Sequence, residues 1–83
     1  MKTIIYDGHK IEVSSMSITA KEEIKYDGKV VSSKRSITGS THIFNVIENE
    51  DNIQYEVEIG TRWHGCSSWN TVRRNGMVIF SDR

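Results

Sequence analysis

The chain of 83 residues contains no leucine, no proline and a single alanine, whereas it has eleven isoleucines and seven valines. Leucine and alanine are the apolar residues that favour helices most, and β-branched residues favour the pleated surface of a sheet. A helical domain is therefore not expected. The absence of proline also leaves every backbone N–H available to a strand ladder. This composition predicts an all-β fold.

The sequence also lacks net charge, a second cysteine and any long apolar run. Eleven basic residues balance eleven acidic ones, so no broad positive field attracts nucleic acid or anionic lipid. No apolar run approaches the roughly 20 residues of a membrane span, and the N-terminus has too few apolar residues for a secretory signal. Cys66 alone cannot form an intrachain disulfide, which fits a reducing compartment. We expect a cytoplasmic protein that binds neither nucleic acid nor membrane.

The length predicts one domain that spans residues 1–83. A chain of this mass buries only about 60% of its unfolded surface, so its core is marginal. Most of the isoleucine, valine and aromatic side chains are therefore needed for packing. For every aromatic residue, burial in the core is therefore the first expectation, and a role in binding is the second.

Three Asx-Gly dipeptides, Asp7-Gly8, Asp27-Gly28 and Asn75-Gly76, predict two-residue type I′ turns between paired strands. A polar stretch over residues 48–52 connects a fourth pair of strands. Eight short strands in four consecutive hairpins result. The expected strands are Thr3–Tyr6, His9–Val13, Lys21–Tyr26, Lys29–Ser33, Thr41–Ile47, Ile53–Ile59, Asn70–Arg74 and Met77–Ser81.

Two of these strands indicate how the sheet is covered. Residues 53–59 alternate between apolar and polar side chains, so one face is buried and the other is wet and acidic. Residues 42–47 are apolar on both faces, which predicts a central strand covered from both sides. Eight strands with such a segment favour a two-layer antiparallel β-sandwich, with a closed β-barrel as the alternative.

A faint repeat relates Tyr6-Asp7-Gly8-His9 to Tyr26-Asp27-Gly28-Lys29 at a spacing of 20 residues. A duplicated hairpin explains this repeat, and so does turn chemistry that is shared without duplication.

The residues with the most binding chemistry are concentrated between Thr61 and Trp69, a stretch that we expect to be a connection of eight to ten residues. Loops of this kind often carry binding residues. We take Arg62, Trp63, His64 and Trp69 as candidate binding residues, because tryptophan and arginine are favoured at the centres of interfaces. The alternative is that both tryptophans are buried over an open end of the sandwich.

Cys66 and His64 suggest two sharper hypotheses. Residues two apart on an extended chain face the same side, so they could form a nucleophile and its base. They could also bind zinc together with His9 or His42. The sequence has no orienting carboxylate that can be identified, no cysteine-hydrolase signature and no paired-cysteine spacing. We therefore predict no catalytic residue, no metal and no cofactor.

Two basic doublets, Lys34-Arg35 and Arg73-Arg74, could align with Arg62 into a basic stripe. Acidic residues of opposite charge are present at Glu22-Glu23 and at Glu56 and Glu58. Cross-strand ion pairs on a solvated face are therefore the preferred interpretation.

Several short motifs occur in a recognisable order. They are His9-Lys10-Ile11-Glu12, Ala20-Lys21 leading to Tyr26-Asp27-Gly28-Lys29, then Arg35, Gly39 before an aromatic strand, and Tyr55-Glu56-Val57-Glu58-Ile59. Over residues 9–60 this order resembles a domain of the Fas apoptotic inhibitory molecule family. The resemblance implies a compact all-β domain that acts through protein contacts and has no known catalytic residues. It assigns no binding residue to this chain.

The sequence as a whole predicts a non-catalytic binding or protein-interaction module. Its partner is expected to be a protein, bound through the Trp63–Trp69 segment or through an unpaired edge strand, and the chain is expected to be a monomer or a weak homodimer. Two alternatives remain open. One is a small thiol-dependent enzyme that uses Cys66 and His64, and the other is a structural subunit without a separate ligand site.

Overall fold

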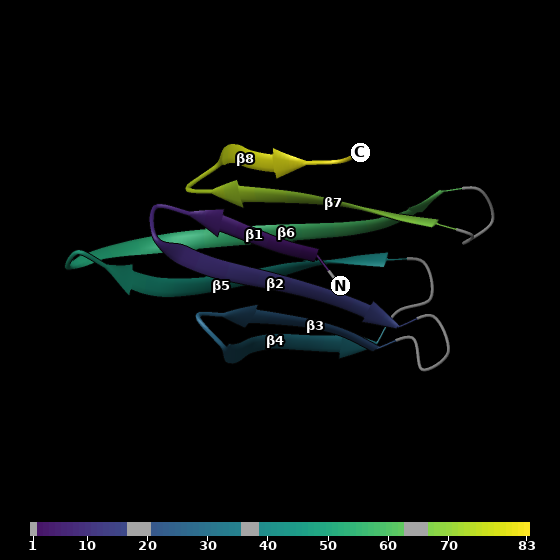
Figure 1. The fold of residues 1–83 in the computed structure, drawn as a ribbon, viewed down its shortest axis with the longest axis horizontal. Helices are drawn as coiled ribbons and strands as arrows, with labels where there is room; N and C mark the ends of the chain where they lie inside the picture. The colour runs from purple at the N-terminus through teal and green to yellow at the C-terminus, as the bar shows by residue number, and fades with distance from the viewer. Residues whose placement is uncertain (1, 17–20, 36–38, 63–66) are drawn as a thin grey trace. The chain divides into compact units, whose positions relative to one another are not determined.

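The computed structural model describes residues 2–16, 21–35, 39–62 and 67–83, which form eight strands (Figure 1). Within these ranges no helix is found that could cross a membrane. The strands are β1 (Lys2–Tyr6), β2 (His9–Met16), β3 (Lys21–Tyr26), β4 (Lys29–Arg35), β5 (Gly39–Glu48), β6 (Asp51–Arg62), β7 (Ser67–Arg74) and β8 (Met77–Ser81).

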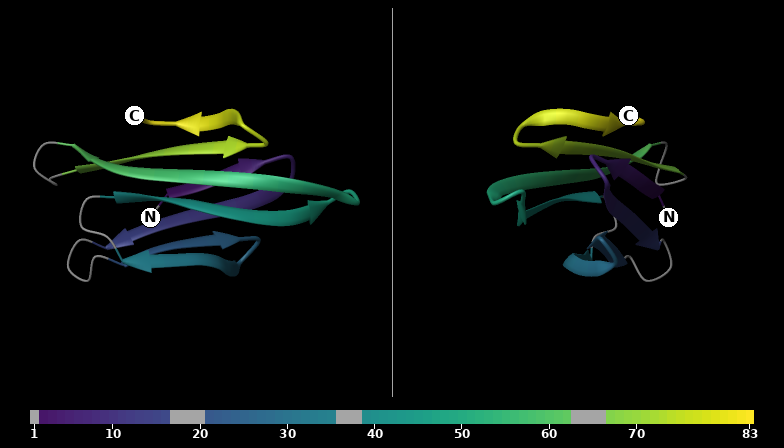
Figure 2. Two further views of the ribbon diagram at one scale, coloured as in Figure 1. Left: turned by 180° about the vertical axis from the view of Figure 1, so that it is seen from behind. Right: turned by 60° about the vertical axis from the view of Figure 1, so that its left-hand side comes forward.

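The strands form two open antiparallel sheets. Sheet A has the order β1-β2-β3-β4, and sheet B has the order β5-β6-β7-β8, which Figure 2 shows from teal to yellow. The prediction of an all-β fold with eight strands in consecutive hairpins and the two sheets of a β-sandwich is confirmed. The described residues form two separate sheets and no closed barrel, which was the alternative. The chain divides into two compact units, Met1–Ile37 and Thr38–Arg83, so the single domain over residues 1–83 stays a prediction.

A two-residue turn connects the two strands of each of the four hairpins. The three Asx-Gly turns have positive φ at both residues, as a type I′ turn requires. The fourth turn, Asn49-Glu50, also has φ of 50° and 68°, although it contains no glycine. Glu48 and Asp51 are therefore paired strand residues, and the expected five-residue polar loop is two residues long.

Sheet A buries one face and exposes the other. Ile4 lies opposite Ile11, and Val13 lies opposite Ile24, and all four side chains are buried. The intervening residues carry charge, for example Lys10 and Glu12, whose side chains approach to 3.7 Å. Since alternate residues of a strand face opposite sides, the register separates a buried, mainly apolar face, which also contains Glu22, from the exposed charged face.

Sheet B follows the same rule, and the alternation expected over residues 53–59 is confirmed. Phe44 and Tyr55 lie opposite each other on the buried face, with their rings stacked at a centroid distance of 5.3 Å. The prediction that residues 42–47 form a central strand is wrong, because β5 lies at the edge of sheet B. Its outward residues Ile43 and Ile47 are 54% and 70% exposed. Apolar residues on both faces therefore do not determine whether a strand has one neighbour or two.

The last hairpins of the two sheets repeat the same construction at a spacing of 48 residues. Each has one register shift, at Ile24/Lys25 in sheet A and at Val72/Arg73 in sheet B. In each hairpin, the first turn residue binds the backbone of the strand that comes before the hairpin, which is β2 in sheet A and β6 in sheet B. Asp27 N donates to the carbonyl of Lys10 at 2.8 Å, and Asn75 N donates to that of Gln54 at 2.8 Å. This repeat is distinct from the one at 20 residues, which relates two turns within sheet A.

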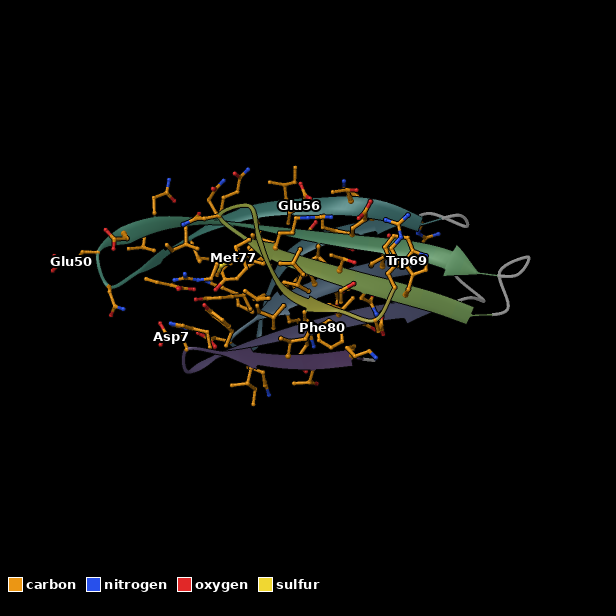
Figure 3. All side chains as sticks on the ribbon, turned by 90° about the horizontal axis from the view of Figure 1, so that it is seen from above. Asp7, Glu50, Glu56, Trp69, Met77 and Phe80 are labelled. Carbon is orange, nitrogen blue, oxygen red and sulfur yellow. The ribbon has the colours of Figure 1, made fainter. Side chains whose placement is uncertain are left out.

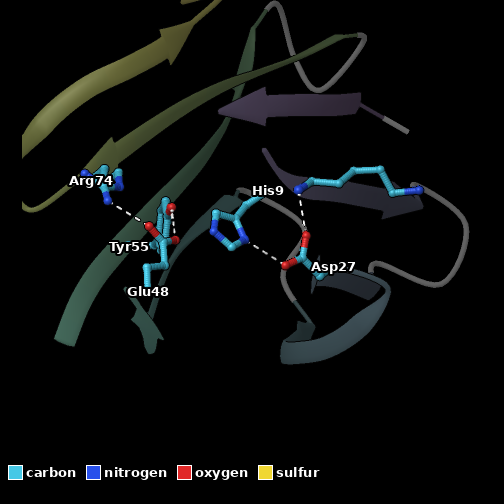
Figure 4. Close-up of polar contacts among 6 residues, drawn as sticks. His9, Asp27, Glu48, Tyr55 and Arg74 are labelled. Carbon is cyan, nitrogen blue, oxygen red and sulfur yellow. Dashed lines mark hydrogen bonds and ion pairs between the residues drawn. The ribbon is translucent and has the colours of Figure 1, made fainter. Parts of the chain in front are cut away.

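A buried polar network connects β5, β6 and β7 (Figure 4). The Tyr55 hydroxyl donates to Glu48 Oε2 at 2.6 Å, and Arg74 Nη2 donates to Glu48 Oε1 at 2.7 Å. Glu48 is only 3% exposed, so its carboxylate depends on donors from the protein, including these two, in place of water. Burial, together with the neighbouring carboxylate, raises the pKa of Tyr55 to about 12, and Glu48 raises the pKa of Arg74.

We predict that Tyr55→Phe lowers the free energy of unfolding by about 2 kcal/mol, because the buried Glu48 carboxylate loses one donor. Tyr55 also contributes stability that is present below its unfolded pKa of 10 and is lost as the pH rises toward 12. The wild type should therefore lose stability between pH 10 and 12, and Tyr55→Phe should reduce this loss. Urea unfolding at several pH values measures both effects.

Glu50→Gln is the control for this prediction, because Glu50 lies exposed in the turn of the same hairpin. A Tyr55→Phe variant as stable as the wild type at neutral pH, with an unchanged profile above pH 10, would show that the network contributes nothing.

Candidate functional site

Two of the candidate binding residues, Arg62 and Trp69, lie at one end of sheet B, where β6 and β7 pair. Gly60 is opposite Trp69, and Arg62 is opposite Ser67. Arg62 and Trp69 are therefore strand residues, and the expected connection of eight to ten residues is wrong. Only residues 63–66 separate the two strands. Trp63 and His64, and Cys66 of the thiol hypothesis, lie outside the described residues.

β6 continues past Ile59, its expected end, and Gly60 is the first of the additional residues. A Cβ atom at this position would overlap the indole ring of Trp69, so the ring lies against the glycine backbone across the strand pair. An aromatic ring packed on a cross-strand glycine protects a point where the strand has no side chain of its own. Gly60 directly follows the alternating residues 53–59, and a glycine in this position can indicate contact with an aromatic ring on the neighbouring strand. The sequence-based prediction instead ended the strand at Ile59.

The Trp69 indole also contacts Arg83. The guanidinium carbon of Arg83 lies 4.6 Å from the centre of the indole ring, within the range of a cation–π interaction. The adjacent Asp82 fixes this segment, because its N–H donates to the carbonyl of Asn70 at 3.0 Å and its carboxylate accepts from the N–H of Asn70. Arg83 is thus held beside Trp69 although β8 ends at Ser81. Arg83 was not among the binding residues expected from the sequence.

A row of charged side chains continues from Trp69 along the same face of sheet B. Arg73 Nη1 lies 2.8 Å from Glu56 Oε1 and 3.4 Å from Glu58 Oε1. The expected cross-strand ion pairs are therefore confirmed for Arg73. Arg74 is different, because its side chain lies on the opposite, buried face with Glu48.

We call this region the Trp69 surface, and Figure 3 shows two of its members, Glu56 and Trp69, among the side chains of sheet B. It comprises Glu56, Glu58, Trp69, Arg73, Ser81 and Arg83, and the buried Thr71 lies on the same face between them. The hydroxyls of Thr71 and Ser81 are 3.0 Å apart across β7 and β8. The surface thus combines one large, half-buried aromatic side chain with charged and hydroxyl groups that already have partners within the sheet. Such a composition suits contact with another molecule.

A second polar site occupies the turn end of sheet A. His9 Nδ1 lies 2.8 Å from Asp27 Oδ2, and the Lys10 N–H donates to Asp27 Oδ1 at 2.8 Å. Hydrogen bonding from His9, followed by that from Lys10, lowers the pKa of Asp27 below its ordinary 3.8. The His9 ring also stacks on Tyr26 at 5.3 Å. These contacts connect the start of β2 to the turn between β3 and β4.

The histidines considered for a zinc site lie in separate surroundings. His9 is bonded to Asp27 in sheet A, whereas His42 is fully buried in β5, with Nε2 3.2 Å from the Ser40 hydroxyl. Over the described ranges, no group of three histidine, cysteine, aspartate or glutamate residues comes together.

Comparisons of the chain with protein-family models, with curated proteins and with solved structures found no match. The resemblance of residues 9–60 to the Fas apoptotic inhibitory molecule family therefore stays a prediction.

We predict that Asp27→Asn destabilises the protein at neutral pH and changes its acid response. A carboxyl with a lowered pKa contributes stability above its unfolded pKa, and this contribution is lost as the pH falls through the lower folded value. The difference in unfolding free energy between wild type and Asp27→Asn should thus shrink as the pH falls below about 4. Denaturant unfolding between neutral and acid pH measures it.

Asparagine suits this test because Asn75 makes the equivalent backbone contact in sheet B, where its Oδ1 accepts from Gln54 N at 2.9 Å. The turn should therefore form in the variant, and only the negative charge of the carboxylate beside His9 is removed. A stability difference that is constant across the pH range would contradict the prediction.

Proposed function

We propose that this chain is a non-catalytic protein-binding module and that the Trp69 surface is its contact region. The observation that carries the proposal is the position of Trp69, which is packed on Gly60 and covered by the guanidinium of Arg83. Tryptophan and arginine contribute most often to the energetic centres of protein interfaces. Here one of each is held together at the end of a sheet.

The contact region is built on strands, which supports the proposal. Trp69 belongs to β7, and Arg73, Glu56 and Glu58 are fixed by cross-strand ion pairs. A partner therefore meets side chains whose positions are already restricted, and the entropy that binding costs is smaller than for a flexible loop. The exposed ion pairs contribute little to stability themselves and provide a polar rim around the indole.

The charge of the region favours a protein partner over a nucleic acid. Glu56 and Glu58 neutralise Arg73, and the chain as a whole carries no net charge. Binding to a phosphate backbone needs several uncompensated basic groups. A cytoplasmic location and the absence of enzymatic activity belong to the same proposal. The family resemblance, which implies action through protein contacts, is in keeping with it.

We predict that Trp69→Ala reduces capture of the binding partner about tenfold or more, because the central aromatic contact is lost. The full-length chain is used as bait in its native lysate, and captured proteins are quantified against the wild type by mass spectrometry. Met77→Ala is the matched control, because Met77 is 56% exposed on the neighbouring β8 at the opposite end of β7.

Trp69→Ala also removes packing from Gly60, so Arg83→Glu is measured beside it. Arg83 is exposed at the chain end, and this variant should keep the fold while it weakens capture. Folded variants, checked by circular dichroism, that capture the same proteins as the wild type would place the contact region elsewhere.

A further inference from the structure

The two sheets have four edge strands, of which three carry features that discourage pairing with another strand. β1 and β8 are only five residues long. β4 contains Lys29, Lys34 and Arg35, and both β4 and β8 lie at register shifts. Short length, basic residues and bulges are the usual ways in which proteins block an open edge.

β5 has none of these features. It is ten residues long, it pairs with β6 without a register shift, and it contains no basic residue other than His42. Its only charged residue is Glu48 at the end, and the carboxylate of Glu48 is bound by Tyr55 and Arg74. The strand is therefore a long, regular and nearly neutral edge.

The turn determines which backbone groups of β5 face the open edge. In a two-residue type I′ hairpin the residues that flank the turn, here Glu48 and Asp51, exchange both hydrogen bonds, and such pairs alternate along the ladder. Asn45 and Gln54 consequently form a pair without hydrogen bonds between them. In agreement, both the N–H and the carbonyl of Gln54 bind Asn75 on the other side. The N–H and carbonyl groups of Ile43, Asn45 and Ile47 thus point away from β6.

The side chains along this edge are also suited to pairing. Ile43 and Ile47 are 54% and 70% exposed and lie on the same face, with Asn45 between them. Two exposed isoleucines beside outward backbone groups form the type of edge that another strand extends.

We infer that two copies of this chain pair through β5 in an antiparallel arrangement, with a two-fold axis at Asn45. In this register Asn45 lies opposite Asn45 of the second copy, and each Ile43 lies opposite the other copy's Ile47. The residues whose backbone groups point outward then face one another, so the ladder continues across the axis. Sheet B and its copy become one sheet of eight strands.

The edge is complementary to itself, which identifies a second copy as the occupant, because each exposed isoleucine meets an isoleucine of the other copy. With Asn45 on the axis, Glu48 lies opposite His42 of the second copy, so the two carboxylates do not meet. The formal net charge of zero means that two chains do not repel each other at a distance. A two-fold contact of one patch with itself is also the commonest geometry of soluble homodimers.

The pairing is independent of the proposed function and compatible with it. β5 and β8 are the two edges of sheet B, so pairing through β5 leaves β7 and β8 uncovered. Opposed residues of paired strands point to the same face, so both Trp69 surfaces would lie on one side of the joint sheet. The dimer would then present two binding surfaces to a partner.

The test is sedimentation equilibrium of the full-length chain from about 1 μM to about 1 mM, the range in which weak dimers dissociate. The wild type should rise from 9.5 kDa toward twice this mass as its concentration increases. Ile47→Lys should raise the dissociation constant at least tenfold, and Asn45→Pro should abolish association, because it removes an N–H that faces the open edge.

Ile5→Lys is the matched control, because Ile5 is 72% exposed on the edge strand β1 of sheet A and should not affect association. Circular dichroism confirms that each variant is folded. A wild type that stays at 9.5 kDa throughout, an Ile47→Lys variant that associates normally, or an Ile5→Lys variant that dissociates equally would each overturn the inference.

Discussion

The register set by four two-residue turns is the constraint on which the rest of this structure depends. Each turn has positive φ at both positions, which fixes which residues of the flanking strands are opposed. A shift of one residue would move every side chain of a strand to the other face. Because Asn49-Glu50 closes its hairpin at Glu48 and Asp51, Tyr55 is placed opposite Phe44, and the pairing of β6 with β7 places it opposite Arg74 as well.

The same register divides the charged residues of sheet B between two roles. Arg73 and Arg74 are neighbours in sequence, yet Arg73 pairs with Glu56 and Glu58 on the exposed face, while Arg74 binds the buried Glu48. The first set of contacts lies further along the same face as Trp69, and the second connects three strands through a network within the buried face. One alternation therefore produces both the stabilising network and the proposed contact region.

Much of the fold could be predicted because its signals are local. Asx-Gly dipeptides, the alternation of residues 53–59 and the apolar run before the polar stretch 48–52 depend only on neighbouring residues, and together they located all eight strands. The Asn49-Glu50 turn was missed because it has no glycine. The edge position of β5 and the burial of Glu48 depend on which strands lie beside them, which no local pattern encodes.

The site could be predicted only in part, for a similar reason. Trp69 was identified from its residue type, whereas Arg83 was not. Counted from the turn at Asn75-Gly76, a regular ladder would place Asp82 opposite Trp69. The register shift at Val72/Arg73 adds one residue, and this brings Arg83 beside the indole instead. Bulges of this kind change the partner of every residue beyond them.

The most direct test of the register is the pattern of nuclear Overhauser effects between Cα hydrogens, which approach closely only in pairs without mutual hydrogen bonds. The structure predicts strong contacts between Asn45 and Gln54, between Ile43 and Glu56, and between Tyr55 and Arg74. Contacts displaced by one residue, such as Phe44 with Gln54, would contradict the register and with it the positions of Trp69, Arg74 and the β5 edge.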